Sequence, residues 1–129
     1  SRWDEMASLL TEDVECAYSD GKYTFNNRDE LMQFLRSSHD ATESMTVSYW
    51  HVTMPEISLT TETTASGKWG MYHFFLNKAE NQQLEMFSYY DDEYVKIAGE
   101  WKIRKTGYHR VMEQEMDRNN LEGLKLNVG

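Results

Sequence analysis

The sequence predicts an α+β fold in which N-terminal helices cover one face of a curved sheet. Two observations lead to this class. In the N-terminal third, apolar residues recur at spacings of three and four, which is the period of a helix. From Met45 onward the chain consists of long runs rich in β-branched and aromatic residues, which favour strands. Helices followed by a meander of strands are typical of α+β proteins.

The N-terminal third is expected to contain two helices separated by a short hairpin. Trp3, Met6, Ala7 and Leu10 form one apolar stripe, so we expect a first helix that ends near residues 11–13. Alternation of apolar and polar residues predicts a strand over 14–18, which ends at the turn Asp20-Gly21, and residues 23–25 can return beside it. Asn27 then has the position of an N-cap for a second helix, which fades over residues 37–40.

The remainder is expected to form four long antiparallel strands. They are predicted at residues 45–59, 64–76, 83–97 and 100–113, joined by turns at 60–63, 77–82 and 98–99. Pro55 interrupts the first of these strands and cannot donate a ladder hydrogen bond, so it indicates an edge strand or a bulge. We expect Trp101 and Ile103 to be buried beneath the helices.

Length and composition limit the classes of function. A chain of 129 residues is expected to form a single domain over residues 1–129, ending in a polar tail at 117–129. The formal charge of −9 repels phosphate backbones, so we expect no nucleic-acid partner. No apolar run approaches the roughly 20 residues of a membrane span, and a single cysteine, Cys16, fits a reducing cytoplasm. There is no initiator methionine, which suggests that residues precede Ser1.

We expect neither a cofactor nor a metal. Glycine-rich phosphate loops are missing, and no H-x-x-x-H, H-x-H or C-x-x-C spacing occurs. Cys16 has no basic neighbour that would activate it and is more simply a buried strand thiol. The chemistry that remains is what ordinary side chains can do alone.

The most informative segment is 48–75, which places His51 and His73 on two successive strands among aromatic residues. Imidazole has an unperturbed pKa of about 6.5, so it can accept or donate a proton near neutral pH. The alternative interpretation is that each histidine is a hydrogen-bonded residue of the core or the rim.

Strand alternation indicates which side chains share a face. In the second long strand His73 lies on the same side as Trp69, Met71 and Phe75. In the preceding strand, a bulge before Pro55 would shift the face of His51 by one position. In the third strand Met86, Ser88, Tyr90 and Asp92 alternate with Phe87, Tyr89 and Asp91, and the acidic run 91–93 is most simply a solvated surface.

Several segments together resemble one known family. The order of elements, with LLTEDVECAYSDG near the front, HVTMPEI followed by TASGKWGMYHFF, and YYDDEYVKIAGEWKI near the end, resembles the SnoaL-like branch of the nuclear transport factor 2-like superfamily over nearly the whole chain. The resemblance implies a cone-shaped sheet wrapped around helices, with a deep and mostly apolar pocket at the open end. It also implies association of sheets, so we expect a homodimer or a higher homo-oligomer.

The same resemblance implies roles for individual residues. The residue before V-x-M-P-E-I, His51, is similar in position to the general base of dehydratases and a dehydrochlorinase in that branch, and His73 matches a second histidine. Arg110 resembles an arginine that faces the pocket. The aspartate that orients the base in these enzymes would fall just upstream of Ser1, and Asp4 lies about one helical turn too late to replace it.

The sequence thus predicts a cofactor-free lyase or isomerase acting on a hydrophobic cyclic or polyketide-like small molecule. His51 and His73 are the predicted catalytic residues. The predicted substrate-binding residues are Tyr18, Trp50, Trp69, Met71, Phe75, Met86, Tyr90 and Arg110. Two alternatives share the fold: a non-catalytic subunit of a ring-hydroxylating dioxygenase and a small-ligand-binding module.

Overall fold

The computed structural model describes residues 2–40 and 45–128. The elements of this described part are α1 (Trp3–Ser8), β1 (Leu10–Tyr18), β2 (Tyr23–Phe25), α2 (Arg28–Asp40), β3 (Thr46–Leu59), β4 (Thr64–Asn77), β5 (Gln82–Ile97) and β6 (Glu100–Asp117). The four long strands begin and end close to the predicted positions, because their β-branched and aromatic runs are bounded by polar turns.

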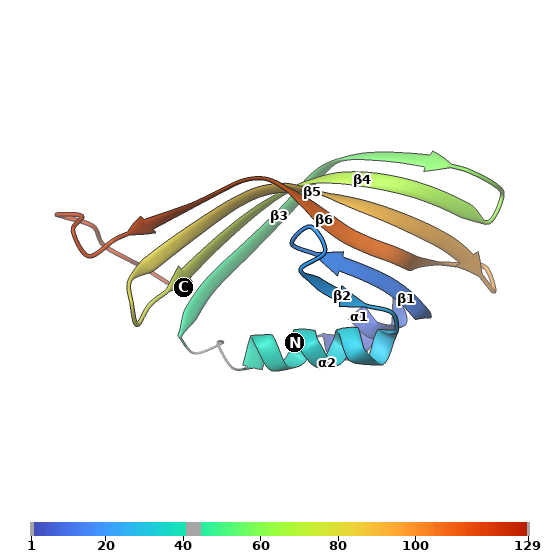
Figure 1. Cartoon of the computed structure of the whole chain (residues 1–129), viewed down its shortest axis with the longest axis horizontal. Helices are drawn as coiled ribbons and strands as arrows, with labels where there is room; N and C mark the ends of the chain where they lie inside the picture. Colours follow the sequence, from blue (N-terminus) through green and yellow to red (C-terminus); the bar gives the residue numbers. More distant parts are fainter. Residues whose placement is uncertain (1, 41–44, 129) are drawn as a thin grey trace.

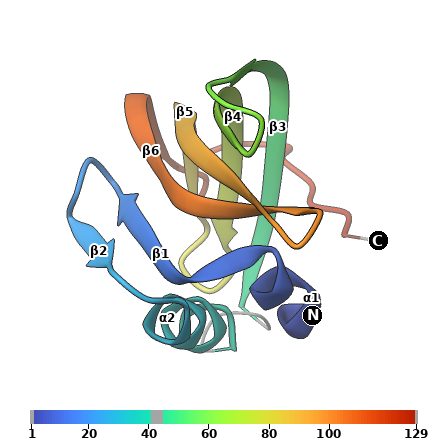
Figure 2. The same ribbon diagram turned by 90° about the vertical axis from the view of Figure 1, so that its right-hand side faces the viewer.

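The strands form one curved sheet in the order β2-β1-β6-β5-β4-β3. The pair β1 and β6 is parallel, and the other neighbours are antiparallel. The sheet arches over the two helices, which lie on its concave side (Figure 1). A view along the arch shows α1 and α2 at its open base (Figure 2). The predicted α+β class and the wrapping of the sheet around the helices are confirmed.

Two local predictions about the long strands are also confirmed. β3 is an edge strand, and its ladder with β4 shifts register between Thr53 and Glu56, around Pro55. Met54, within this bulge, has a φ of 53°. The turn between β5 and β6 consists of Ala98 and Gly99, with φ values of 51° and 82°, as a tight hairpin turn requires.

The core that holds the helices in place lies between α2 and β1. It consists of Leu10, Val14, Cys16, Leu31 and Met32. The start of α2 is capped as predicted, because the Asn27 side-chain oxygen accepts a hydrogen bond of 2.9 Å from the Glu30 backbone N–H.

Two expectations are wrong. Leu10 does not end a helix but begins β1, because it pairs in parallel with Ile103 of β6, and this tertiary pairing overrides the helical spacing. Trp101 is 41% exposed instead of buried, because it lies beside the β5–β6 turn, where Lys96 approaches its ring. Ile103, two residues further from the turn, does pack against the core.

Candidate functional site

The pairing of β3 with β4 decides which histidine lies among the aromatic residues. The ladder has no bulge before Thr53, and within it Trp50 pairs with His73. Paired residues in an antiparallel ladder project from the same side of the sheet, whereas neighbours along one strand project from opposite sides. Trp50 and His73 therefore share one face, and His51 projects from the other.

The face that carries His73 is the concave one. His73 pairs with Met86 of β5, and Asp92 lies on the same face further along that strand. The Asp92 carboxylate accepts a hydrogen bond of 2.7 Å from the hydroxyl of Thr106, which pairs with Cys16 in the core beneath α2. The helices and His73 thus lie on the same side of the sheet.

His73 is held by three neighbours on this face. Its ring stacks on Trp50 with centroids 4.2 Å apart and an interplanar angle of 7°, and Phe75 contacts it from the side with centroids 6.2 Å apart. Its Nε2 lies 2.9 Å from the Ser48 hydroxyl. Burial lowers the pKa of His73 below its ordinary value, because desolvation disfavours the imidazolium. The ring is therefore neutral at pH 7.

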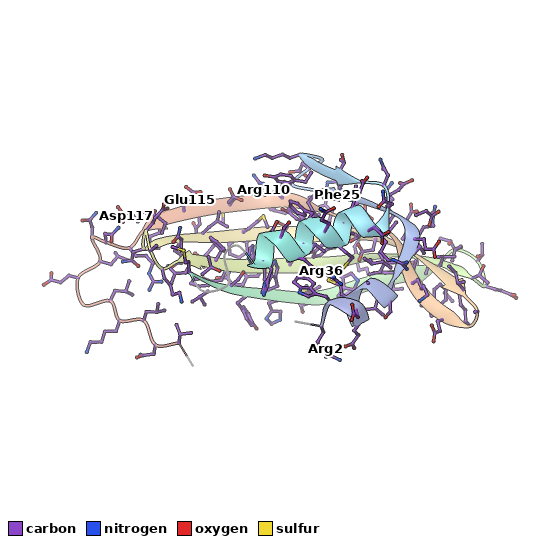
Figure 3. The ribbon with its side chains drawn as sticks, turned by 90° about the horizontal axis from the view of Figure 1, so that it is seen from below. Arg2, Phe25, Arg36, Arg110, Glu115 and Asp117 are labelled. Carbon is purple, nitrogen blue, oxygen red and sulfur yellow. The ribbon has the colours of Figure 1, made fainter. Side chains whose placement is uncertain are left out.

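All the predicted substrate-binding residues lie on the same concave face. The ladders place five of them there directly: Trp50, Trp69, Met71, Met86 and Tyr90, and Phe75 follows His73 by two positions. Tyr18 joins from β1, where it stacks on Tyr108 with centroids 5.5 Å apart. Arg110 pairs with Ser88 and lies on β6 to one side of α2 when the face is seen from below (Figure 3).

His51 is not brought to this face. It is exposed on the convex side, where its Nδ1 lies 3.4 Å from the Tyr49 hydroxyl. The bulge at Pro55 comes too late in the strand to turn it inward. The placement of His51 implied by the resemblance is therefore corrected, because Trp50 occupies the inward position next to His73.

Residues 91–93 are not wholly the solvated surface that their composition predicts, because Asp92 lies in a buried polar cluster. Asp92 is 8% exposed and accepts hydrogen bonds from Tyr94, at 3.1 Å, and from Thr106. The indole N–H of Trp69 donates to the Tyr94 hydroxyl at 2.9 Å. The signal that could have revealed this cluster is the alternation of β5, which places Asp92 on the face of Met86 and Tyr90.

Burial raises the pKa of several other titratable groups of this face. It raises the pKa of Tyr90 and of Tyr94 to about 12, and that of Cys16 to about 11. It also raises the pKa of Tyr18 and of Asp92 above their ordinary values. At pH 7 the phenols are hydrogen-bond donors and the thiol is not a nucleophile, so His73 is the neutral base that this face offers.

Three hollows in the described part of the chain are lined by residues other than those around His73. One of about 460 Å³ is lined by Ala7 and residues of α2, and one of about 400 Å³ lies around Asp20, Gly107 and His109. A third surrounds Trp3 in α1. None of the predicted site residues lines any of the three. The deep pocket that the resemblance implied is not among them, and Met71 and Met86 are buried on the concave face.

Neither metal ligands nor a membrane helix emerges from the described residues. Within residues 2–40 and 45–128, no group of three or more histidine, cysteine, aspartate or glutamate side chains is placed to hold a metal ion. No helix there has the length and the apolar character needed to cross a bilayer.

Comparison with known proteins decides the family. The sequence model of the SnoaL-like domain matches residues 1–107. The chain belongs to the SnoaL-like family. Solved structures share the fold of this SnoaL-like chain. A candidate scytalone dehydratase from Novosphingobium aromaticivorans gives a TM-score of 0.74 at 21% identity, over 87% of this chain and 72% of that one.

Two further structures show the same cone fold. The hexachlorocyclohexane dehydrochlorinase LinA-type3 from Novosphingobium barchaimii gives a TM-score of 0.74 at 15% identity, over 99% of this SnoaL-like chain and 82% of that one. A candidate aromatic ring hydroxylase from Novosphingobium aromaticivorans gives 0.74 at 16% identity, over 90% and 80%. At these identities the likeness establishes the fold.

Proposed function

We propose that this protein is a cofactor-free lyase or isomerase that removes a proton from carbon in a hydrophobic cyclic or polyketide-like molecule, with His73 as the base. The observation that carries the proposal is the neutral imidazole of His73, stacked on Trp50 and hydrogen-bonded to Ser48 on the concave face. Among the known structures of this fold, the names of a dehydratase and a dehydrochlorinase denote eliminations, and an elimination that forms a C–C double bond removes a proton from carbon.

The geometry suits a general base. Stacking and the hydrogen bond fix the ring plane, so the lone pair does not have to be oriented during the reaction. When the Ser48 hydroxyl accepts from Nε2–H, Nδ1 is the unprotonated nitrogen that takes the substrate proton. The lowered pKa keeps this nitrogen free at pH 7. A positioned general base contributes about 10²–10⁴ in rate.

The substrate class follows from the surroundings of His73. Trp50, Met71, Phe75 and Met86 present aromatic rings and thioethers, which favour an apolar ring system. Trp50 is 54% exposed, so a ligand can approach His73 from the open side of the arch. Cys16 is a buried free thiol, and we place the protein in the reducing cytoplasm.

A second candidate function is ligand binding without turnover. It is favoured by the hydrogen-bond partner of His73, which in the described part of the chain is the Ser48 hydroxyl and not a carboxylate. A carboxylate would stabilise the imidazolium that forms after proton transfer.

Proton transfer can be tested with 1-tetralone, a bicyclic ketone, by following deuterium uptake at its α-carbon in heavy water by NMR. We expect the wild type to exceed buffer, and His73→Gln to lose about a hundredfold of this rate. His51→Gln is the matched control, because His51 lies on a strand beside His73 but faces the other way. It should retain full exchange.

The pH profile provides a second measurement in the same assay. The rate should fall as the pH drops through the pKa of His73, with a midpoint below its ordinary value, since only the neutral ring accepts a proton. Loss of exchange in His51→Gln with full exchange in His73→Gln would contradict the proposal. Binding of 1-tetralone with no exchange above buffer would favour the ligand-binding function.

A further inference from the structure

One hydroxyl on the concave face is buried without a hydrogen-bond partner among the described residues. Ser88 is 6% exposed, and its Oγ has no hydrogen-bond partner among the described residues. A buried hydroxyl without a partner destabilises the fold, and alanine would occupy nearly the same space without that penalty. A serine at this position is explained if something outside the chain accepts its hydrogen bond.

Ser88 lies next to the proposed base. It pairs with Met71 on one side and with Arg110 on the other, and the neighbouring row of the sheet holds His73 and Met86. Rows on the same face are two residues apart, which is about 7 Å along a strand. A molecule the size of one or two fused rings can therefore contact the imidazole of His73 and the hydroxyl of Ser88 together.

We propose that Ser88 binds the carbonyl oxygen of the substrate, and that Ser88 and Arg110 form the polar end of the site. This inference rests on the proposed function. His73 takes the proton from the carbon next to the carbonyl, the C–H electron pair forms the new C–C double bond, and the carbonyl π electrons move onto the oxygen. The Ser88 hydroxyl donates a hydrogen bond to the resulting enolate. Reprotonation at carbon, or loss of a leaving group from the neighbouring carbon, completes an isomerisation or an elimination.

Two flexible side chains are neighbours of Ser88 on this face of the sheet. Met71 pairs with Ser88, Met86 precedes it by two positions on the same face, and both methionines are buried. Methionine is unbranched and adapts its shape at low energy. The ligand reaches Ser88 by displacing these thioethers, which accounts for the absence of Ser88 from the linings of the three hollows in the described part.

Arg110 supplies a positive charge at the same end. Its Nε lies 3.5 Å from a carboxylate oxygen of Glu113, and both side chains are partly exposed. The guanidinium is thus held on the rim of the concave face by a weak surface ion pair. It is available to a developing enolate in a protein that otherwise carries a net negative charge.

The test compares Ser88→Ala with a matched control, Thr11→Val. Thr11 is the other buried hydroxyl without a partner in the described residues, and it lies on β1, three strands from β4. Binding of 1-tetralone and of tetralin, which lacks the carbonyl, is measured by intrinsic tryptophan fluorescence. We expect the wild type to prefer 1-tetralone, Ser88→Ala to lose about three- to tenfold in affinity for it, and tetralin to bind all three proteins equally.

Thermal unfolding separates this role from a structural one. Both variants should melt at or above the wild-type temperature, because each removes an unsatisfied buried hydroxyl. A lower melting temperature for Ser88→Ala alone would show a hydrogen bond within the protein and overturn the proposal. Equal preference for 1-tetralone in wild type and Ser88→Ala, or no preference in the wild type, would also overturn it.

The same proteins distinguish failure of this inference from failure of the proposed function. If His73→Gln stops deuterium exchange while Ser88→Ala keeps wild-type binding and exchange, His73 remains the base and the assignment of Ser88 is wrong. If Ser88→Ala loses the carbonyl preference although the wild type gives no exchange above buffer, the oxygen-binding subsite stands and the catalytic proposal fails.

Discussion

Replacing Asp92 with alanine is expected to destabilise this protein strongly. The Asp92 carboxylate accepts hydrogen bonds from Tyr94 at 3.1 Å, from Thr106 at 2.7 Å and from the backbone N–H of Gly107. Each buried donor left without an acceptor costs about 1–3 kcal/mol. Loss of the buried charge offsets part of this cost, so we expect a net loss of about 2–4 kcal/mol in the free energy of unfolding. Domains of this size have about 5–15 kcal/mol in total.

The assay is urea unfolding at pH 7, with Asp91→Ala as the control. Asp91 is the adjacent residue, and it is exposed on the opposite face of β5. Its replacement should change the free energy of unfolding by no more than about 0.5 kcal/mol. If Asp92→Ala were as stable as Asp91→Ala, the hydrogen bonds to the carboxylate would have no net stabilising effect, and the reasoning would be refuted.

The pH dependence provides an independent check with Asp92→Asn. Burial raises the pKa of Asp92, so the folded protein holds the proton more tightly than the unfolded chain does. As the pH rises from about 4, the unfolded chain releases its proton first, and the contribution of this group to stability falls until the folded pKa is passed. The stability of the wild type relative to Asp92→Asn should therefore decrease over this range, and an increase would contradict the raised pKa.

Two further predictions concern packing and assembly. Gly107→Ala should lower the melting temperature more than Gly70→Ala, because a Cβ at Gly107 would lie 2.4 Å from the backbone oxygen of Ala17, whereas the nearest atom to one at Gly70 is 3.5 Å away. Equal melting temperatures would show that β1 and β6 can separate at this point. The protein should also form a homodimer, because Tyr49 and Met54 of edge strand β3 are 56% and 80% exposed, and light scattering should give at least twice the chain mass of 15.2 kDa. A monomer at high micromolar concentration would contradict this.

Local sequence determined most of the elements of the fold. The long strands were recognisable because alternation, β-branched residues and polar turns act over a few neighbouring positions. The cap at Asn27 and the bulge at Pro55 were predictable for the same reason, since each depends on the chemistry of one residue. Leu10 was misassigned because its partner, Ile103, is distant in the sequence.

Burial of single polar residues could not be read from their neighbours in sequence. The run 91–93 has the composition of a solvated surface, yet Asp92 is buried because Tyr94 and Thr106 donate to its carboxylate. Ser88 is buried between residues of two other strands. Whether a buried polar group has a hydrogen-bond partner depends on which strands are neighbours in the assembled sheet.

For the candidate site, the two histidines show what the sequence determined and what only the tertiary structure decided. The sequence by itself determined that His51 and His73 lie on adjacent strands among aromatic residues. Only the tertiary structure decided that Trp50, and not His51, shares the concave face with His73. Side chains alternate with a period of two, so a shift of one residue in the pairing of β3 with β4 would have exchanged the two faces. That register is set by the contacts of the whole ladder, which no short segment of the sequence contains.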